Sequence, residues 1–269
     1  ISAQGLISGF SALIWSKISG KKYVITSLSI YHFPESGLYR NFAKWVFGNA
    51  DKILVQSHDS KKEFTNLKIP EEKILVFSHW ENKKLFLPKS KIEAKRRLKF
   101  NGHFVVSFFG RLVKEKGIKE LLDSVSSINP KITLAIYGNG PLINEVLSKE
   151  KKSKNVKYMG IVIPEDLPWH YSASNIVIMP STAEEGFGKV AAGALLCGTP
   201  VIASNRGALP QVVTNKVGKL IEPTPQEIAK AINGLYSDRV KLRKLSNAAR
   251  KYALKKFSEK NANAIISIL

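Results

Sequence analysis

Short runs of apolar, often β-branched residues alternate along this chain with segments whose apolar residues recur at helical spacing. Strands are expected over residues 22–26, 53–55, 74–77, 104–109, 132–137, 156–159, 176–179 and 201–203. Strands that alternate with helices pair in parallel, because each connection has to cross the sheet, and the helices then cover both sheet faces. The pattern predicts an α/β fold built on doubly wound parallel sheets.

One stretch interrupts this alternation. Residues 83–103 are polar and basic, contain Pro88 and show no strand pattern, as is typical of a linker between domains. We therefore expect two Rossmann-like domains, with lysine-rich helices at the end of the chain. The expected parts are a first domain over 1–86, a linker over 87–103, a second domain over 104–235 and C-terminal helices over 236–269.

The first residues are uncharged but do not form a secretory signal, because no basic segment precedes them and no small-residue cleavage site follows. Leu6, Phe10 and Leu13 recur at helical spacing and predict a helix. No segment approaches the roughly 20 apolar residues of a spanning helix, and a cytoplasmic location is expected. Since the sequence begins with Ile1, the chain is interpreted as an internal piece of a longer protein.

The 269 residues carry a formal net charge of +21, from 42 Lys and Arg against 21 Asp and Glu. A positive field attracts nucleic acid, anionic membranes and phosphate-bearing small molecules, but lysines on solvated helix faces give the same count. The single cysteine, Cys197, excludes an internal disulfide and a cysteine-based zinc site, and is expected in the core. The histidines show no metal-ligand spacing, and no aromatic-basic pattern points to nucleic acid.

The first candidate site follows the strand expected over residues 104–109. Arg111 and Lys116 lie between Gly110 and Gly117, after that strand and before a helix. Ligands of open parallel sheets bind beyond the carboxyl ends of the strands, where Arg offers a planar fork and Lys a point charge to a phosphate. The alternative is a solvated loop in a lysine-rich chain.

A second segment, Gly138-Asn139-Gly140-Pro141, follows the strand over 132–137. It is similar to a phosphate loop but lacks the third glycine of the dinucleotide fingerprint. Pro141 fits the first position of the next helix. The segment is therefore interpreted as a tight turn, with a phosphate loop as the alternative.

The strongest signal is the segment over 179–190, which leads from a strand through Gly186 and Gly188 into a helix. The glycines allow close approach of a ligand, and a helix N-terminus attracts phosphate. Glu185 would repel a phosphate unless it faces a hydroxylated part of the same ligand. The segment thus predicts a ligand with a diphosphate and a sugar, and a capping role for Glu185 is the alternative.

Residues 104–235 resemble the donor-binding domain of retaining GT-B glycosyltransferases of family 4, the glycosyltransferase group 1 domain. The resemblance is carried by FFGRLVKEKGIKELL, LAIYGNGPL, VKYMGIVIPEDLPWHYSASNIVIMPS, EEGFGKVAAGALLCGTPVIASNRGALPQVV and GKLIEP. Residues 1–86 are similar to the second half of the family's acceptor domain, through NADKILVQSHDSKKEF and KILVFSHWENKKLF. The resemblance implies a GT-B-like fold whose N-terminal domain is incomplete in this sequence.

The resemblance also implies an activity: transfer of a sugar from a nucleotide-sugar donor to an acceptor hydroxyl, with retention of configuration and without a metal or other cofactor. Arg111 and Lys116 would neutralise the donor diphosphate and Glu185 would contact sugar hydroxyls, so these three are the expected catalytic residues. The expected donor-binding residues are Gly110, Arg111, Lys116, Gly138, Glu185, Gly186, Phe187, Gly188, Lys189 and Val190.

Three positions depart from the family pattern. Gly193 replaces a second glutamate that holds the ribose in the family, Leu28 replaces a histidine, and Gln211 replaces a glutamate. Loss of a charge-assisted hydrogen bond costs about 1.5–3 kcal/mol, so donor binding is expected to be weaker. A degenerate relative that binds sugar nucleotides or glycans without catalysis is the alternative.

The expected partners follow from the resemblance and from the charge. They are a nucleotide-sugar donor and a glycan or lipid-linked acceptor in glycan biosynthesis. The charge of +21 favours an anionic membrane surface, so a peripheral position on the inner membrane face is one expectation. No nucleic-acid partner is expected.

Overall fold

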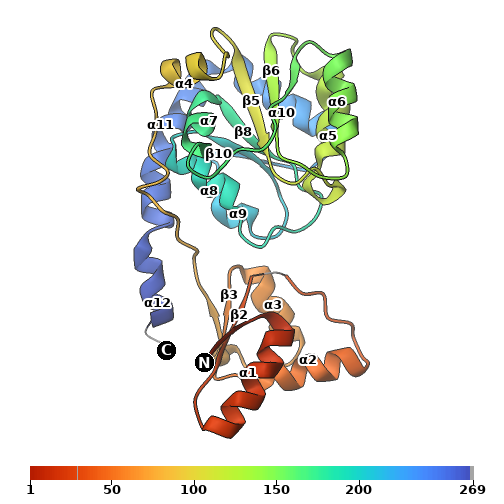
Figure 1. Cartoon of the computed structure of the whole chain (residues 1–269), viewed down its shortest axis with the longest axis vertical. Helices are drawn as coiled ribbons and strands as arrows, with labels where there is room; N and C mark the ends of the chain where they lie inside the picture. Colours follow the sequence, from red (N-terminus) through yellow and green to blue (C-terminus); the bar gives the residue numbers. More distant parts are fainter. Residues whose placement is uncertain (29, 267–269) are drawn as a thin grey trace. The chain divides into compact units, whose positions relative to one another are not determined.

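The computed structural model describes residues 1–28 and 30–266, and it divides into two compact units. The first unit contains Ile1–Trp80, Glu184–Phe187 and the segment from Glu259 onward. The second contains Glu81–Ala183 and Gly188–Ser258. Each unit has its own parallel sheet (Figure 1), which confirms the predicted α/β class with two Rossmann-like units.

The first unit is built on a four-stranded sheet in the order β1-β2-β3-β4, and every neighbouring pair is parallel. Its elements are β1 (Ser2–Gln4), α1 (Gly5–Ser19), β2 (Val24–Ser27), α2 (Leu38–Gly48), β3 (Lys52–Val55), α3 (His58–Asn66), η1 (Glu71–Lys73), β4 (Ile74–Val76), η4 (Glu259–Ala262) and α12 (Asn263–Ile266).

The core of the first unit lies between this sheet and the buried faces of α1 and α2. Phe47 and Phe64 pack edge to face, with ring centroids 4.8 Å apart. The chain entering β2 is fixed by Tyr23, whose hydroxyl donates to the Val46 carbonyl at 2.7 Å and whose amide donates to Asp51 at 2.8 Å. Burial raises the pKa of Tyr23 to about 12, so this hydroxyl keeps its proton and its hydrogen bond.

The second unit is built on a six-stranded parallel sheet in the order β10-β9-β8-β5-β6-β7. Its elements are α4 (Lys91–Arg97), β5 (Phe104–Phe109), η2 (Lys114–Lys116), α5 (Ile118–Asp123), η3 (Ser124–Ser127), β6 (Ile132–Tyr137), α6 (Ile143–Lys152), β7 (Val156–Tyr158), α7 (Leu167–Ala173), β8 (Ile176–Met179), α8 (Lys189–Leu196), β9 (Val201–Ser204), α9 (Leu209–Val212), β10 (Gly218–Ile221), α10 (Pro225–Ser237) and α11 (Arg239–Lys256).

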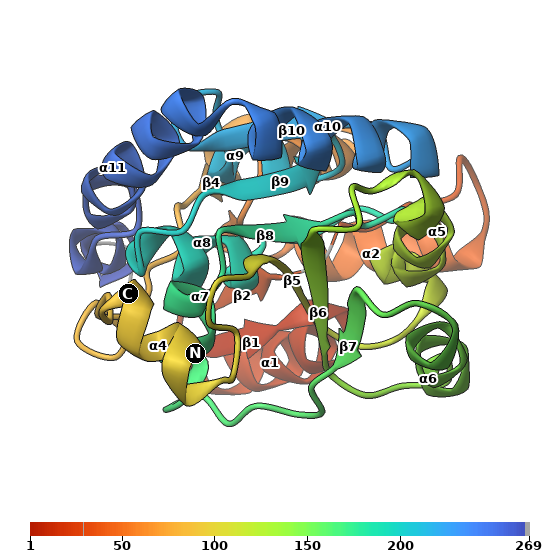
Figure 2. The ribbon, with the colours of Figure 1, turned by 90° about the horizontal axis from the view of Figure 1, so that it is seen from above.

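Helices cover both faces of this sheet. Figure 2 shows α10 on one side of β8 and β9, with α7 and α8 on the other. All six residues of β5 and all six of β6 are buried, as expected for central strands of a covered parallel sheet. The strand order reverses at β5, since the chain continues to β6 on one side and reaches β8 on the other. A ligand is expected at such a reversal, beyond the carboxyl ends of the strands.

Four elements differ from the sequence-based expectations. Residues 2–4 form β1 rather than the start of the helix, and β10 was not predicted, because both strands are short and carry polar residues. The expected linker contains α4, whose only buried residue is Ala94, so an apolar pattern could not reveal it. The sequence also predicts a helix over residues 118–128, but α5 ends at Asp123 and a 3₁₀ turn begins at Ser124, whose hydroxyl donates to the Leu121 carbonyl at 2.7 Å.

The unit boundaries also differ in detail from the proposed domains. Residues 81–103 belong to the second unit, to which they are joined by hydrogen bonds: the Lys89 amide donates to Ser172 Oγ at 2.9 Å, and Arg97 pairs with Asp166 at 3.0 Å. Helix α11 belongs to the second unit as well. Residues 267–269, at the end of the expected C-terminal helices, lie outside the described residues.

None of the helices in the described part of the chain has the length and apolarity that crossing a bilayer requires.

Cys197 is a free, buried thiol at the end of α8, as expected for a core residue. Burial raises its pKa to about 12, against the smaller lowering effect of Arg250 and Lys89.

The central strand β6 gives a first stability prediction. Ile136 is fully buried and lies between Phe108 of β5 and Tyr158 of β7. Ile136→Ala should lower the free energy of unfolding by about 2–5 kcal/mol, through lost burial and a cavity. Val240→Ala, at a position 68% exposed in the same unit, should change it by less than about 0.5 kcal/mol. Equal urea midpoints for the two variants would contradict the assigned core.

The thiol gives a second prediction. Because only the thiolate reacts, iodoacetamide at pH 8 should leave Cys197 unmodified in the folded protein and label it fully in denaturant. Intact-mass spectrometry measures both reactions. Rapid labelling of the folded protein would show that α8 does not bury this residue.

Candidate functional site

The loops that follow β5 and β6 are joined by backbone hydrogen bonds. The Gly110 amide donates to the Tyr137 carbonyl at 3.1 Å, and the Leu112 amide donates to the Asn139 carbonyl at 2.8 Å. The Leu112 carbonyl accepts in turn from the Leu142 amide at 3.0 Å. These bonds hold the segment that carries Arg111 against the start of the next loop, and the Arg111 side chain itself is exposed.

Gly138 has a structural reason to be glycine. Its φ is +131°, and an added Cβ would lie 1.8 Å from the Gly110 carbonyl oxygen. Its amide donates to the Gly160 carbonyl at 2.8 Å, and its carbonyl accepts from the Tyr158 hydroxyl at 2.9 Å. These contacts with the rest of the protein fit the interpretation as a tight turn. The two loops approach each other closely because Gly138 has no side chain.

The loop with Lys116 is fixed to the loop that follows β8. The amides of Thr182 and Ala183 donate to the Glu115 carbonyl at 3.0 and 3.2 Å. An added Cβ at Gly117, where φ is +69°, would lie 1.8 Å from the Pro180 carbonyl oxygen. The chain after β5 and the chain after β8 thus form one connected surface at the strand reversal, and Lys116 is half-buried within it.

Helix α8 begins at the same end of the sheet. Gly188 is its N-cap with φ +96° and supplies no side-chain cap, and the first turn starts with Lys189 and Val190. The first amides of a helix have no partner within the helix, and they add to the positive end of its dipole. An anion can therefore be bound here by backbone N–H groups.

A cavity of about 360 Å³ connects several of these features within the second unit. Its volume lies within the usual range of small-molecule sites. Arg111 contributes a positive charge to its wall, and Val190 contributes the start of α8. Its lining consists of Phe109, Gly110, Arg111, Tyr137, Gly138, Asn139, Ile161, Val162, Leu167, Tyr171 and Val190.

The inner walls of this cavity are aromatic. Phe109 and Tyr137 stack with ring centroids 4.4 Å apart and an interplanar angle of 3°, and Phe109 meets Tyr171 edge to face at 4.7 Å. Burial raises the pKa of both tyrosines well above its usual value, so both hydroxyls stay protonated. Among the described residues, the buried Tyr137 hydroxyl has no hydrogen-bond partner.

His170 lies behind Tyr137, with the two rings edge to face at 4.9 Å. Burial lowers the pKa of His170, and the positive charge of Arg97 adds to this against the raising effect of Asp166. The imidazole is therefore neutral at pH 7. It supports the aromatic wall and brings no positive charge to the cavity.

The segment Glu184–Phe187 belongs to the first unit and is described with it. An added Cβ at Gly186 would lie 2.2 Å from the Leu28 carbonyl oxygen, and the Phe187 ring lies 4.7 Å from that of His79. Glu184 pairs with His32 at 3.1 Å. The segment that contains Glu185, Gly186 and Phe187 can therefore pack closely only because position 186 is a glycine.

The position of the family's second glutamate is filled by aromatic rings. An added Cβ at Gly193 would lie 3.0 Å from Tyr171 Cε2 and 3.2 Å from Phe86 Cε1. A glutamate could enter here only if these rings moved. The glycine is therefore matched to its surroundings, and a ribose bound near this helix would need other partners.

Four of the residues predicted from sequence lie in one cavity: Gly110, Arg111, Gly138 and Val190. The sequence interpretation missed the aromatic wall, since Tyr137 and Tyr171 were assigned only to a strand and a helix. The sequence offers no signal for this wall, because a tyrosine in a strand or helix looks the same whether it faces a core or a cavity. Among the described residues, no group of three or more His, Cys, Asp or Glu could hold a metal ion.

The family of the chain follows from a match to a protein-family model. The model of the family "Glycosyl transferases group 1" matches residues 90–252, which is more than half of the chain. The chain therefore belongs to this family.

The similar proteins show the same class. CapM of Staphylococcus aureus, a capsular polysaccharide biosynthesis glycosyltransferase, is 29% identical over 225 residues, 79% of this chain and 59% of CapM. A GDP-mannose-dependent alpha-(1-6)-phosphatidylinositol monomannoside mannosyltransferase of Mycobacterium tuberculosis is 29% identical over 180 residues, 61% of this chain and 46% of that protein. The chain thus spans about half the length of these relatives.

Solved structures show the same fold. HepE of Anabaena, crystallised in complex with UDP, superposes with a TM-score of 0.90 at 24% identity, covering 99% of this chain and 77% of that one. At this level of identity the similarity defines the two-unit GT-B architecture and no substrate.

The glycine at position 138 gives a third prediction. Gly138→Ala should lower the melting temperature by several degrees, because the new Cβ has to displace the Gly110 carbonyl as well as adopt a positive φ. Gly160→Ala is the matched control, since Gly160 also has a positive φ of +72° but no atom within 4 Å of an added Cβ. Gly160→Ala should lower the free energy of unfolding by only about 1 kcal/mol. Equal melting temperatures would contradict the close approach.

Proposed function

We propose that this chain belongs to a glycosyltransferase that moves a sugar from a nucleotide-sugar donor to an acceptor hydroxyl, and that its second unit binds the donor. The observation that carries the proposal is the cavity beyond β5 and β6, which has aromatic inner walls and reaches both Arg111 and the start of α8. A nucleoside needs an apolar slot, and its diphosphate needs positive charge at the slot's edge. Both are present in one cavity.

The nucleoside end is assigned to the aromatic wall. Base and ribose would lie among Phe109, Tyr137 and Tyr171, where stacking replaces water. The protonated Tyr137 hydroxyl would donate to, or accept from, a polar atom of the nucleoside. Since Gly193 offers no carboxylate, we expect binding to depend on this wall more than in relatives with the second glutamate.

The diphosphate end is assigned to Arg111, Lys116 and the first amides of α8, at Gly188, Lys189 and Val190. As the sugar–phosphate bond breaks, negative charge grows on the departing diphosphate. Fixed cations and backbone dipoles aimed at that charge stabilise the transition state without reorganisation. We propose that these groups take the place of a catalytic metal.

The sugar end and the stereochemistry follow from the resemblance to retaining family-4 enzymes. Glu185 would contact the hydroxyls of the donor sugar, with Gly186 and Phe187 beside it. The acceptor hydroxyl would attack from the face that the diphosphate leaves, through an oxocarbenium-like state, so the configuration is retained. We propose a glycan or lipid-linked acceptor, reached from the cytoplasmic side at an anionic membrane surface that the charge of +21 favours.

Binding is the first test. Arg111→Ala should weaken the binding of UDP or GDP, whichever the protein prefers, by about 10–100-fold in calorimetry, because a charge-assisted contact is worth about 1.5–3 kcal/mol. Arg243→Ala removes an exposed arginine from α11 in the same unit and should leave the affinity unchanged. Both diphosphates are needed because the relative named above depends on GDP-mannose and HepE was crystallised with UDP. Equal affinities of the two variants would overturn the assignment.

Turnover is the second test, and it separates an enzyme from a non-catalytic relative. Donor hydrolysis by the wild-type protein should exceed that of Glu185→Ala, while nucleoside diphosphate affinity stays the same, since Glu185 is assigned to the sugar. Binding of the diphosphate with equal hydrolysis rates would favour the degenerate, non-catalytic alternative, which the replacement at Gly193 motivates.

A further inference from the structure

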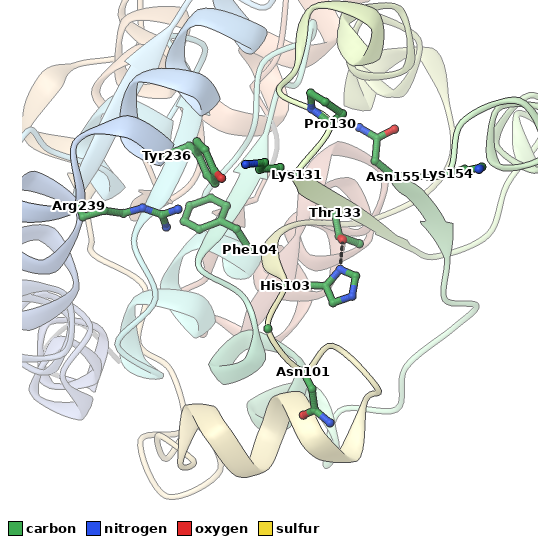
Figure 3. A pocket seen from close by; sticks show the side chains of 11 residues that line it. Asn101, His103, Phe104, Pro130, Lys131, Thr133, Lys154, Asn155, Tyr236 and Arg239 are labelled. Atoms are coloured by element: carbon green, nitrogen blue, oxygen red, sulfur yellow. Dashed lines mark hydrogen bonds between the residues drawn. The ribbon is translucent and has the colours of Figure 1, made fainter.

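A second cavity opens at the opposite end of the same strands. It measures about 660 Å³ and lies where β5 and β6 begin, whereas the cavity assigned to the donor lies where they end. Figure 3 shows its side chains, which come from β5, β6, the chain before β7 and the α10–α11 junction. Its lining consists of Asn101, Gly102, His103, Phe104, Pro130, Lys131, Thr133, Lys154, Asn155, Tyr236 and Arg239.

The charged groups in this lining have one sign. Arg239, Lys131 and Lys154 come from three separate segments of the chain, and no aspartate or glutamate is among the lining residues. An anion that enters this space would therefore meet only positive charge among the charged residues of the lining. The acidic side chain nearest in sequence, Asp238, accepts from the Lys241 amide at 2.8 Å and caps α11.

The guanidinium of Arg239 is held by rings. It lies 4.3 Å from the ring centroids of both Phe104 and Tyr236, which themselves meet edge to face at 5.1 Å. Among the described residues, no carboxylate forms an ion pair with it. An arginine stacked in this way is pre-organised, and its N–H fork stays available for an oxyanion.

The charge of Arg239 also acts on its surroundings. Burial and, secondly, the positive charge of Arg239 lower the pKa of Lys95, whose ammonium donates to the His103 carbonyl and to Asn175. Arg239 further occupies the first position of α11, and the first turn of that helix has no acidic residue, although the helix dipole disfavours a cation there.

Side chains that can form hydrogen bonds complete the cavity. His103 Nδ1 and Thr133 Oγ1 lie 2.7 Å apart (Figure 3), so the imidazole is fixed in orientation. Asn101 and Asn155 contribute amides. A cavity with three cations and these polar groups suits a ligand with at least two negative charges, and its volume leaves room for an organic group beside the rings.

We infer that this cavity binds a phosphoryl-bearing anion, at a site separate from the donor. A phosphoryl group spreads two charges over several oxygens, which can meet the Arg239 fork and the Lys131 ammonium together. A single carboxylate offers one charge and would leave part of the cluster unneutralised. The phosphoryl group belongs to a soluble molecule or to a lipid headgroup, and the experiment distinguishes the two.

The test uses pyrophosphate as the soluble probe and local amides as reporters. In ¹⁵N–¹H spectra of the whole chain, pyrophosphate should shift the Gly102 and Asn155 signals with a saturable dependence. The double variant Arg239→Gln/Lys131→Gln should weaken this effect at least tenfold. Lys149→Gln/Lys152→Gln, an equal charge change on α6, is the control and should leave it unchanged. Arg239→Lys should weaken it severalfold, since the charge stays but the fork is lost.

Vesicles provide the second arm. Binding to phosphatidylglycerol vesicles but not to phosphatidylcholine vesicles, lost in the Arg239→Gln/Lys131→Gln variant alone, would support the site with a lipid headgroup as its ligand. If pyrophosphate leaves both reporter amides unmoved and vesicle binding is the same in the two double variants, the proposal is wrong. Because the reporters lie at the amino ends of the strands, this result does not depend on the donor site.

Discussion

The position of β5 between β6 and β8 is the constraint on which the second unit depends. Hydrogen-bonded on both sides, this strand has all six residues buried, and the chain leaves it in one direction and returns on the other side. Loops from neighbouring strands therefore meet at its carboxyl end. The bonds from Gly110 to Tyr137 and from Thr182 to Glu115 then hold these loops together. The cavity, Arg111 and the start of α8 take their places from this arrangement.

Three glycines shape the site where these loops meet. At Gly138 and Gly117 an added Cβ would lie 1.8 Å from a carbonyl oxygen of the neighbouring loop. At Gly193 the missing side chain has a different result, since Phe86 and Tyr171 occupy the space. The missing Cβ thus permits loop contact at Gly138 and Gly117. At Gly193 the two rings leave no room for a carboxylate side chain. Tyr171, one of these two rings, also belongs to the aromatic inner wall of the cavity.

The sequence was sufficient to predict the fold class and the parts of the site that lie on the chain next to strand ends. Arg111 and Gly138 could be located because each lies within two residues of the end of a predicted buried strand. Tyr137 and Tyr171 could not, because a tyrosine at a strand end or in a helix has the same sequence signature whether it faces a core or a cavity. The cavity around Arg239 was equally hidden, since its cations come from three segments whose proximity only the sheet order determines. Helix α4 escaped prediction because a single residue, Ala94, is buried.

The central claim is that a nucleoside diphosphate binds beyond the carboxyl ends of β5 and β6. Hydrogen–deuterium exchange of the whole chain, with and without a saturating nucleoside diphosphate, tests it most directly. Bound diphosphate should slow exchange in peptides covering residues 109–112, 137–140 and 188–191, with no comparable change in α6. Unchanged exchange in these three peptides, or protection confined to the opposite strand ends at 101–104 and 236–240, would contradict it.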